Sequence, residues 1–397
     1  MTPSERELIQ QFKHQLGPII HLDYSGDDSA QAHHRLGQNA RAQIHKILSG
    51  RLDALGETAQ VIGQIRRACK YRAALQTKSQ LPGLDETVKT ALRQYSACLS
   101  AWAAGAQLAD FRHPLLPDNV DQFSVSANDL ATFLQEDEVG CQTGVIRERD
   151  GAVILWHTEE DLETCPGQRF DQLRLFSFRA AQGRISTGFI YPDLLPGPTF
   201  GWQGRDYVQA IDTLHVKPVD FEYAILPNTL AWLSLYLGTS FSREKLAKLL
   251  GPFQGGYSLT SVAQKDGQVS VEKIEYAGDQ VAASSLAAEA GGYLFQTNVI
   301  RDLSLPIGAQ EQTSAESRAW NETRMARTAR FMKAIQKSVT ALPLIFRMLY
   351  SHSGGESAYC NHDVKAYLVC RMAAERTSIR VGSGAPAPDD ELFTYEE

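Results

Sequence analysis

The sequence predicts an α+β fold in which a helical leader precedes a core of layered antiparallel sheets. Two observations support this prediction. Near residue 140 the chain changes from apolar residues recurring every three or four positions to short β-type runs separated by turn residues. Those runs are joined mostly by hairpin-type turns, with helical blocks between early and late strands, which is typical of antiparallel sheets covered by helices.

The leader is expected to be helical because it is rich in Ala, Leu, Gln and Arg at helical spacing. Ser4 is a candidate N-cap for the first amphipathic stretch. Pro82-Gly83 and the proline-containing segment 113–119 are expected to be loops between helices. The expected helices are 30–48, 53–76 and 85–108.

After Gly140 the predicted strands pair as hairpins. The Asp-Gly step of Arg149-Asp150-Gly151 favours a tight turn, and Gln182-Gly183 is expected to turn a second pair. The tail from Pro386 is expected to be solvated. The expected strands are 143–148, 152–157, 170–178, 184–191, 258–264, 268–276, 292–298, 364–372 and 377–381. The expected helices are 226–237, 242–250 with Ser242 as its N-cap, and 315–338.

Composition excludes several classes of protein. The chain has 397 residues, 43% of them hydrophobic, so it is long enough to bury a sizeable core. Its net charge of -7 disfavours a broad nucleic-acid-binding face. No apolar run approaches the ~18 residues that span a bilayer, and the polar N-terminus lacks the apolar centre of a signal peptide. The six cysteines have no disulfide-framework or metal-ligand spacing. We expect a soluble, cytoplasmic protein without metal, cofactor, nucleic-acid partner or membrane partner.

The dipeptide Gly140-Cys141 stands where the leader gives way to the first strand. Because Gly140 has no Cβ, the Cys141 thiol can reach the preceding carbonyl, which is the geometry for an N-to-S acyl shift, a thioester and self-cleavage. The new α-amine, with an ordinary pKa of about 7.7–8.0, would be a suitable general base for the thiol. The alternative is a turn glycine beside a structural strand cysteine, which the dipeptide alone favours.

Five segments from Gly140 onward occur in an order that resembles one protein family. Gly140-Cys141-Gln142-Thr143, the hairpin and Ile154 to Asp161 are similar to the start of the mature chain in isopenicillin N acyltransferase-like proteins, which are N-terminal-nucleophile hydrolases. The hairpin resembles that of the β-alanyl-dopamine hydrolase branch. The family's Gly-x-Leu-Pro-Gly, Asn-ending strand, Cys-x-His block and closing turn are matched in order by segments 191–202, 296–298, 349–362 and 379–386.

The resemblance implies a four-layer αββα catalytic core over residues 141–397. Residues 1–140 would form a helical N-terminal fragment that stays attached after self-cleavage of the Gly140–Cys141 bond. The implied activity is that of an amide-bond hydrolase or acyltransferase acting through a thioester, as in secondary metabolism. Its partners would be a small acylated amine or peptide-like metabolite as acyl donor, and an amine or water as acceptor.

The resemblance also implies roles for individual residues. Cys141 would be the nucleophile, and Asn298, at the end of a matched strand, would belong to its site. Where the family has Glu-Asp, this chain has Glu159-Glu160 before Asp161, so the processing carboxylate is either Glu160 or Asp161.

Two positions depart from the family's amide-bearing oxyanion site. Asp212 stands where an Asn is usual, and Tyr257-Ser258-Leu259-Thr260 contains no amide side chain. An ionised Asp212 would repel an oxyanion, whereas the Thr260 hydroxyl could donate to it. These changes favour a second hypothesis, in which the chain is an unprocessed, catalytically impaired relative that acts as a binding or scaffold protein. The intact Gly140-Cys141 favours the enzyme.

Two further residues are candidate substrate contacts. His157 lies on the second predicted strand at a spacing that could face the site, and the alternative is a histidine hydrogen-bonded to backbone. A pocket lined by Trp202, Phe200 or Trp156 would suit an apolar acyl chain. Cys360 precedes His362 by two positions and could share its strand face, but we expect it to be structural.

Overall fold

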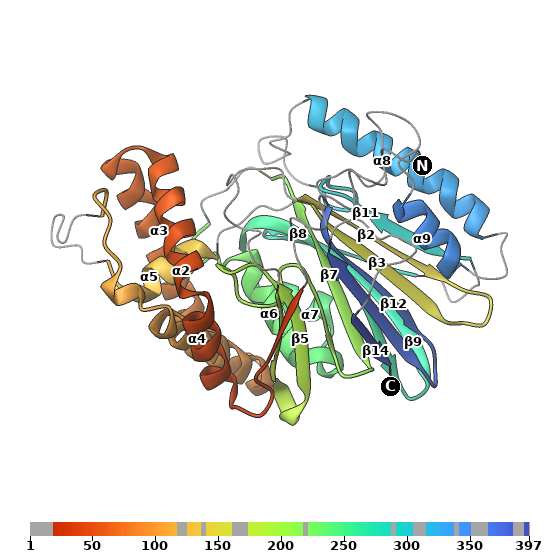
Figure 1. The fold of residues 1–397 in the computed structure, drawn as a ribbon, viewed down its shortest axis with the longest axis horizontal. Helices are drawn as coiled ribbons and strands as arrows, with labels where there is room; N and C mark the ends of the chain where they lie inside the picture. The colour runs from red at the N-terminus through yellow and green to blue at the C-terminus, as the bar shows by residue number, and fades with distance from the viewer. Residues whose placement is uncertain are drawn as a thin grey trace.

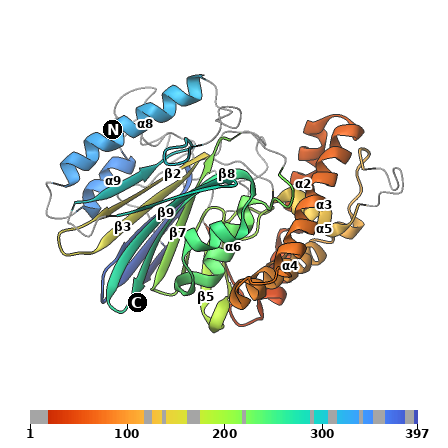
Figure 2. The same ribbon diagram turned by 180° about the vertical axis from the view of Figure 1, so that it is seen from behind.

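The computed structural model describes residues 19–116, 125–135, 140–160, 174–216, 221–286, 291–304, 315–336, 341–350, 364–383 and 393–396. Over these ranges the protein is a mixed α+β structure with two β-sheets and helices outside them (Figures 1 and 2). The α+β prediction is therefore confirmed. Ser4, Asp161, Cys360 and Pro386 lie outside the described residues.

The leader forms the three expected long helices and a short fourth helix, Ala127–Leu134, that was not predicted. Their N-termini are capped in the usual way, since Asp28 and Asp85 accept hydrogen bonds from first-turn amides and Ser126 forms a capping box with Asp129. The helices are α2 (Ser29–Leu55), α3 (Thr58–Ser79), α4 (Glu86–Gly105) and α5 (Ala127–Leu134). The sequence pattern did not predict the strand before them, β1 (Ile20–Asp23), which pairs in parallel with the edge of a sheet.

The strands form an eight-stranded and a six-stranded sheet. The eight-stranded sheet runs in the order β1, β4 (Arg174–Arg179), β5 (Ile185–Ile190), β6 (Phe200–Gln203), β7 (Tyr207–Leu214), β8 (Phe253–Lys265), β9 (Gln268–Gly278) and β10 (Gln280–Ser285). The six-stranded sheet runs in the order β11 (Tyr293–Gln296), β2 (Gly140–Arg147), β3 (Val153–Glu160), β12 (Val364–Met372), β13 (Thr377–Ser383) and β14 (Phe393–Glu396). The helices of this part are α6 (Pro227–Leu237), α7 (Arg243–Leu250), α8 (Ala315–Ile335) and α9 (Leu342–Tyr350).

The hairpins expected around Arg149-Asp150-Gly151 and Gln182-Gly183 are present as β2–β3 and β4–β5. Ser242 caps α7, as expected. Strands β6, β7, β10 and β14 and helix α9 were not predicted. Strand β14 pairs with β13 in the tail beyond Pro386, where a solvated tail and no strand was expected. Strand β7 is buried along its whole length, and its buried polar residues Gln209 and Asp212 remove the period-two alternation that identifies a half-exposed strand.

The two sheets pack face to face, and alternation along each strand decides which layer a side chain enters. On β3, Leu155 enters the apolar cluster between the sheets, together with Phe189 and Val262 of the other sheet. Its neighbour Trp156 enters the opposite cluster, formed with α8 and α9. By the same period-two rule, Cys141, Thr143 and His157 face the other sheet, while Glu160 faces α8.

The leader shares its core with the outer face of the eight-stranded sheet. One cluster contains Leu36 and Trp102 of the leader together with Phe176 of β4 and Trp232 of α6. Helices α2 and α4 of the leader lie beside α6 and β5 (Figures 1 and 2). Polar contacts reinforce this attachment, since Arg51 Nη2 lies 2.6 Å from the buried Asp193 carboxylate. A break in the backbone at residue 140 would therefore leave the two pieces associated through buried apolar surface.

Helices α2 and α4 approach so closely that only glycine fits at two positions. A Cβ on Gly37 would overlap the Trp102 carbonyl oxygen, and one on Gly105 would overlap the His34 carbonyl oxygen. We expect Gly37→Ala to lower the free energy of unfolding by about 1–3 kcal/mol, because backbone must move to admit the methyl group. Chemical denaturation measures this loss.

The control is Gly63→Ala on α3, where an added Cβ meets nothing within 4 Å. That change should raise the free energy of unfolding by about 0.5–1 kcal/mol, since alanine is the better helix former. A Gly37→Ala protein as stable as wild type would mean that α2 and α4 are not packed backbone to backbone.

Candidate active site

Cys141 lies near the start of β2, buried between the two sheets, with only 2% of its surface exposed. Its backbone N–H donates to Asn298 Oδ1 at 3.3 Å, and its Sγ–H donates to the Ile211 carbonyl at 3.2 Å. Asn298 Nδ2 donates to the Thr213 carbonyl at 3.0 Å and lies 3.7 Å from Cys141 Sγ. Asn298 therefore bridges Cys141 and the facing strand β7.

Strand pairing brings these residues together. Gln296, the last residue of β11, pairs with Thr143 of β2, so the chain leaving β11 delivers Asn298 beside Cys141. Strand β7 belongs to the other sheet and supplies Ile211 and Thr213 from across the interface.

Arg324 of α8 approaches Cys141 from the opposite side of the sheet. Its Nη2 donates to both oxygens of Glu160, at 2.9 and 2.8 Å, and to the Cys141 carbonyl oxygen at 3.3 Å. The Thr158 hydroxyl also donates to Glu160, at 3.0 Å. The side chains of Arg324 and Glu160 are only 3% and 8% exposed, so this is a buried ion pair. Glu160 is thus linked to Cys141 through Arg324.

His157 is held entirely by side chains, rather than by backbone as the sequence alternative supposed. Its Nε2 lies 2.7 Å from Glu159 Oε1, and its Nδ1 lies 2.8 Å from the Thr143 hydroxyl. Tyr191 donates its hydroxyl proton to the other oxygen of Glu159 at 2.7 Å. Both oxygens of Glu159 and both ring nitrogens of His157 are therefore engaged in hydrogen bonds.

Asp212 is a buried carboxyl group in this polar layer. It is fully buried on β7, in register with Ser258 of β8. Neither carboxyl oxygen makes a hydrogen bond of normal geometry with a described residue, although the Thr143 hydroxyl is near enough to stabilise the carboxylate. Burial raises the pKa of Asp212 to about 7, against the lowering effects of the His157 charge and the Thr143 hydroxyl. The expected repulsion of an oxyanion by Asp212 therefore applies only above about neutral pH, where the carboxylate predominates.

The Cys141 thiol is protonated in this environment. Burial raises its pKa well above the ordinary value, and the negative charges of Asp212 and Glu159 raise it further. A nucleophilic role for this thiol therefore requires a base that removes its proton as it attacks.

The remaining sequence candidates lie farther along the same layer or outside it. Thr260 is buried on β8 in register with Ala210, two residues before Asp212 on the paired strand. Trp202 is packed in the apolar cluster between the sheets, whereas Trp156 faces α8 and α9. The two tryptophans therefore enter different layers, and only Trp202 lies on the same side of its sheet as Cys141. Gly140 pairs with Glu160.

Four residues of this constellation were not among the sequence candidates: Thr143, Glu159, Tyr191 and Arg324. Glu159 adjoins the predicted carboxylate Glu160, but alternation places the two on opposite faces of β3. Arg324 is one of several arginines on α8 and has no distinguishing spacing in the sequence.

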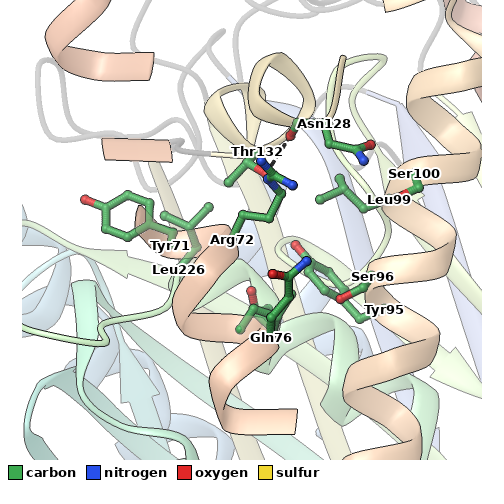
Figure 3. Close-up of a pocket in the computed structure, with 12 residues that line it drawn as sticks. Tyr71, Arg72, Gln76, Tyr95, Ser96, Leu99, Ser100, Asn128, Thr132 and Leu226 are labelled. Carbon is green, nitrogen blue, oxygen red and sulfur yellow. Dashed lines mark hydrogen bonds between the residues drawn. The ribbon is translucent and has the colours of Figure 1, made fainter. Parts of the chain in front are cut away.

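Cavities elsewhere in the described structure lack this chemistry. One of about 60 Å³ lies between leader helices and the start of α6, where Thr132 donates to the Asn128 carbonyl at 2.8 Å (Figure 3). It has room for a few waters but not for an acylated substrate. A second cavity, of about 300 Å³, is lined by Lys273, Asp302 and Phe295. In the described part of the chain, no cluster of three or more His, Cys, Asp or Glu side chains could hold a metal ion. None of the helices described there is both long and apolar enough to cross a membrane.

Comparisons with known proteins add little to this geometry. The chain matches no protein family, and no curated protein is recognisably similar to it in sequence. Among solved structures it is similar to a single-residue variant of conjugated bile acid hydrolase from Clostridium perfringens. That similarity has a TM-score of 0.38 and 10% sequence identity, and it covers 64% of this chain and 92% of the other. Such a distant similarity does not establish the activity of this chain.

Proposed function

We propose that the protein is a cysteine N-terminal-nucleophile amidohydrolase or acyltransferase with a four-layer αββα core. Self-cleavage of the Gly140–Cys141 bond would expose Cys141 as the N-terminal residue, which then acts through a thioester on a small acylated amine or peptide-like metabolite. The supporting observation is that buried groups hold three polar atoms of Cys141: Asn298 at the nitrogen, the Ile211 carbonyl at the sulfur and Arg324 at the oxygen.

The same contacts suit turnover after cleavage. The amide nitrogen of Cys141 would become an α-amine, and Asn298 Oδ1 already accepts a hydrogen bond from that nitrogen. The amine would take the thiol proton as Sγ attacks the acyl carbon and would then protonate the leaving nitrogen. Water or an acceptor amine would resolve the thioester, regenerating the thiol.

Burial of Cys141 favours the second candidate, an unprocessed relative that binds or scaffolds. The thiol is almost inaccessible and its pKa is raised, as in structural buried cysteines. In that case Arg324 and Glu160 would serve only as a buried ion pair.

The denatured mass of the purified protein, with N-terminal sequencing of each fragment, separates the two candidates. The proposed enzyme gives two pieces, the larger beginning at Cys141, which elute together under native conditions because the leader shares its core with the sheet. A single chain of 397 residues would overturn the proposal, since Cys141 would then lack its amine base.

A further inference from the structure

Before the chain is cut, Cys141 has no α-amine, so the first acyl shift needs another base. The amide nitrogen of Cys141 is not basic, and the thiol is buried and protonated. Within the described structure, three carboxyl groups act on the thiol through their charges: Asp212, Glu159 and Glu160. These three carboxyl groups are therefore the candidates to accept the proton of the Cys141 thiol.

The three carboxyl groups differ in how many hydrogen bonds they already accept. Glu159 is occupied by His157 on one oxygen and by Tyr191 on the other. Glu160 is occupied by Arg324 on both oxygens. Asp212, by contrast, is fully buried and forms no hydrogen bond of normal geometry in the part of the chain described, although the Thr143 hydroxyl is near enough to lower its pKa.

The position of Asp212 fits transfer to and from Cys141. The thiol donates its proton to the carbonyl of Ile211, the group bonded directly to the Asp212 nitrogen. Alternation along β7 turns the Asp212 side chain to the face between the sheets, which Cys141 also occupies. A buried carboxyl without an ion pair or a close hydrogen bond is costly to keep in a folded protein, and carboxyl groups with raised pKa values are typical of sites where protons are exchanged.

We propose that Asp212 is the proton carrier of self-cleavage, taking the proton of Cys141 Sγ and returning it to the Cys141 nitrogen. This inference rests on the self-cleaving function proposed above. As Sγ adds to the Gly140 carbonyl carbon, the carboxylate of Asp212 takes the thiol proton and the carbonyl oxygen gains negative charge. The carbon–nitrogen bond then breaks as Asp212 returns the proton to nitrogen, leaving a thioester and a free α-amine. Water hydrolyses the thioester, releasing the Gly140 carboxylate and restoring the thiol.

This role gives cleavage a definite pH dependence. Asp212 must start as the carboxylate, and its pKa is raised to about 7, so the cleavage rate should rise from about pH 5 and level off above about pH 8. The charged groups that act on Asp212 are His157 of β3, Arg324 of α8 and Lys273 of β9, all of which lower its pKa. Those that act on the thiol from β3 are Glu159 and Glu160, which raise its pKa.

The test measures the rate of self-cleavage in newly synthesised chains. The full-length protein is produced by cell-free translation and moved to buffers between about pH 5 and 9, and the cut fraction is followed by denatured mass. We expect Asp212→Asn, which has the same shape but cannot take a proton, to cut at least ~100-fold more slowly than wild type on the plateau at about pH 8 and to lose the rise through about pH 7. The control is Ser258→Ala, a buried change on the neighbouring strand, which should cut with the wild-type rate and pH profile.

Each result has a distinct meaning. A wild-type rate that rises through about pH 7, a nearly uncut Asp212→Asn chain and a normal Ser258→Ala chain would support the proton carrier. If Asp212→Asn cuts as wild type does, or if both variants fail equally, the proposal for Asp212 is overturned while the self-cleaving function stands. If the wild-type chain never cuts, the self-cleaving function itself fails.

Discussion

Replacing Cys141 by alanine is expected to leave an uncut chain that turns over no substrate, a loss of at least ~10³-fold. Alanine removes Sγ, the atom that would form both the intramolecular and the substrate thioester. It keeps the backbone N–H that donates to Asn298 and the carbonyl that accepts from Arg324, so the fold should be retained. Denatured mass measures the first effect, and release of amine from an acylated substrate measures the second.

Two other variants test whether the loss is specific to the thiol of Cys141. Cys370→Ala removes another buried thiol, from β12 in the cluster between the sheets, and should leave cutting and turnover unchanged. Cys141→Ser should still cut, more slowly, because a hydroxyl can also perform the acyl shift. Turnover by a Cys141→Ala protein would remove Cys141 as the nucleophile.

Replacing Arg324 by methionine is expected to lower the free energy of unfolding by about 3–5 kcal/mol. The change removes the arginine from Glu160, a nearly buried carboxylate that accepts a hydrogen bond from the Thr158 hydroxyl. Urea denaturation should be measured in a Cys141→Ala background, where every variant is a single chain.

A second substitution separates the charge from the packing. Glu160→Gln combined with Arg324→Met removes both charges, so most of the lost stability should return. Arg35→Met, which breaks the exposed pair of Arg35 and Asp27 at 2.9 Å, should cost no more than about 1 kcal/mol. An Arg324→Met protein as stable as wild type would mean that Glu160 is not a buried partner of this arginine.

The local sequence pattern was sufficient to predict helices and strands whose apolar residues recur with a clear period. The helices of the leader and the hairpin around Asp150-Gly151 are where the sequence places them, because periodicity and turn chemistry are properties of adjacent residues. Strand β7 escaped prediction because both its faces are buried, so its polar residues are not separated from its apolar ones. Strand β1 escaped because its partner β4 lies far away in the sequence, beyond the whole leader.

The sequence by itself determined the α+β class and drew attention to Gly140-Cys141, since both depend on neighbouring residues. Only the tertiary structure decided what surrounds Cys141. Asn298 arrives through pairing of β11 with β2, and Arg324 arrives from a helix packed on the opposite face. The raised pKa of Asp212 likewise follows from burial between two sheets, because the free energy of a carboxylate depends on the surrounding solvent and charges and not on its neighbours in sequence.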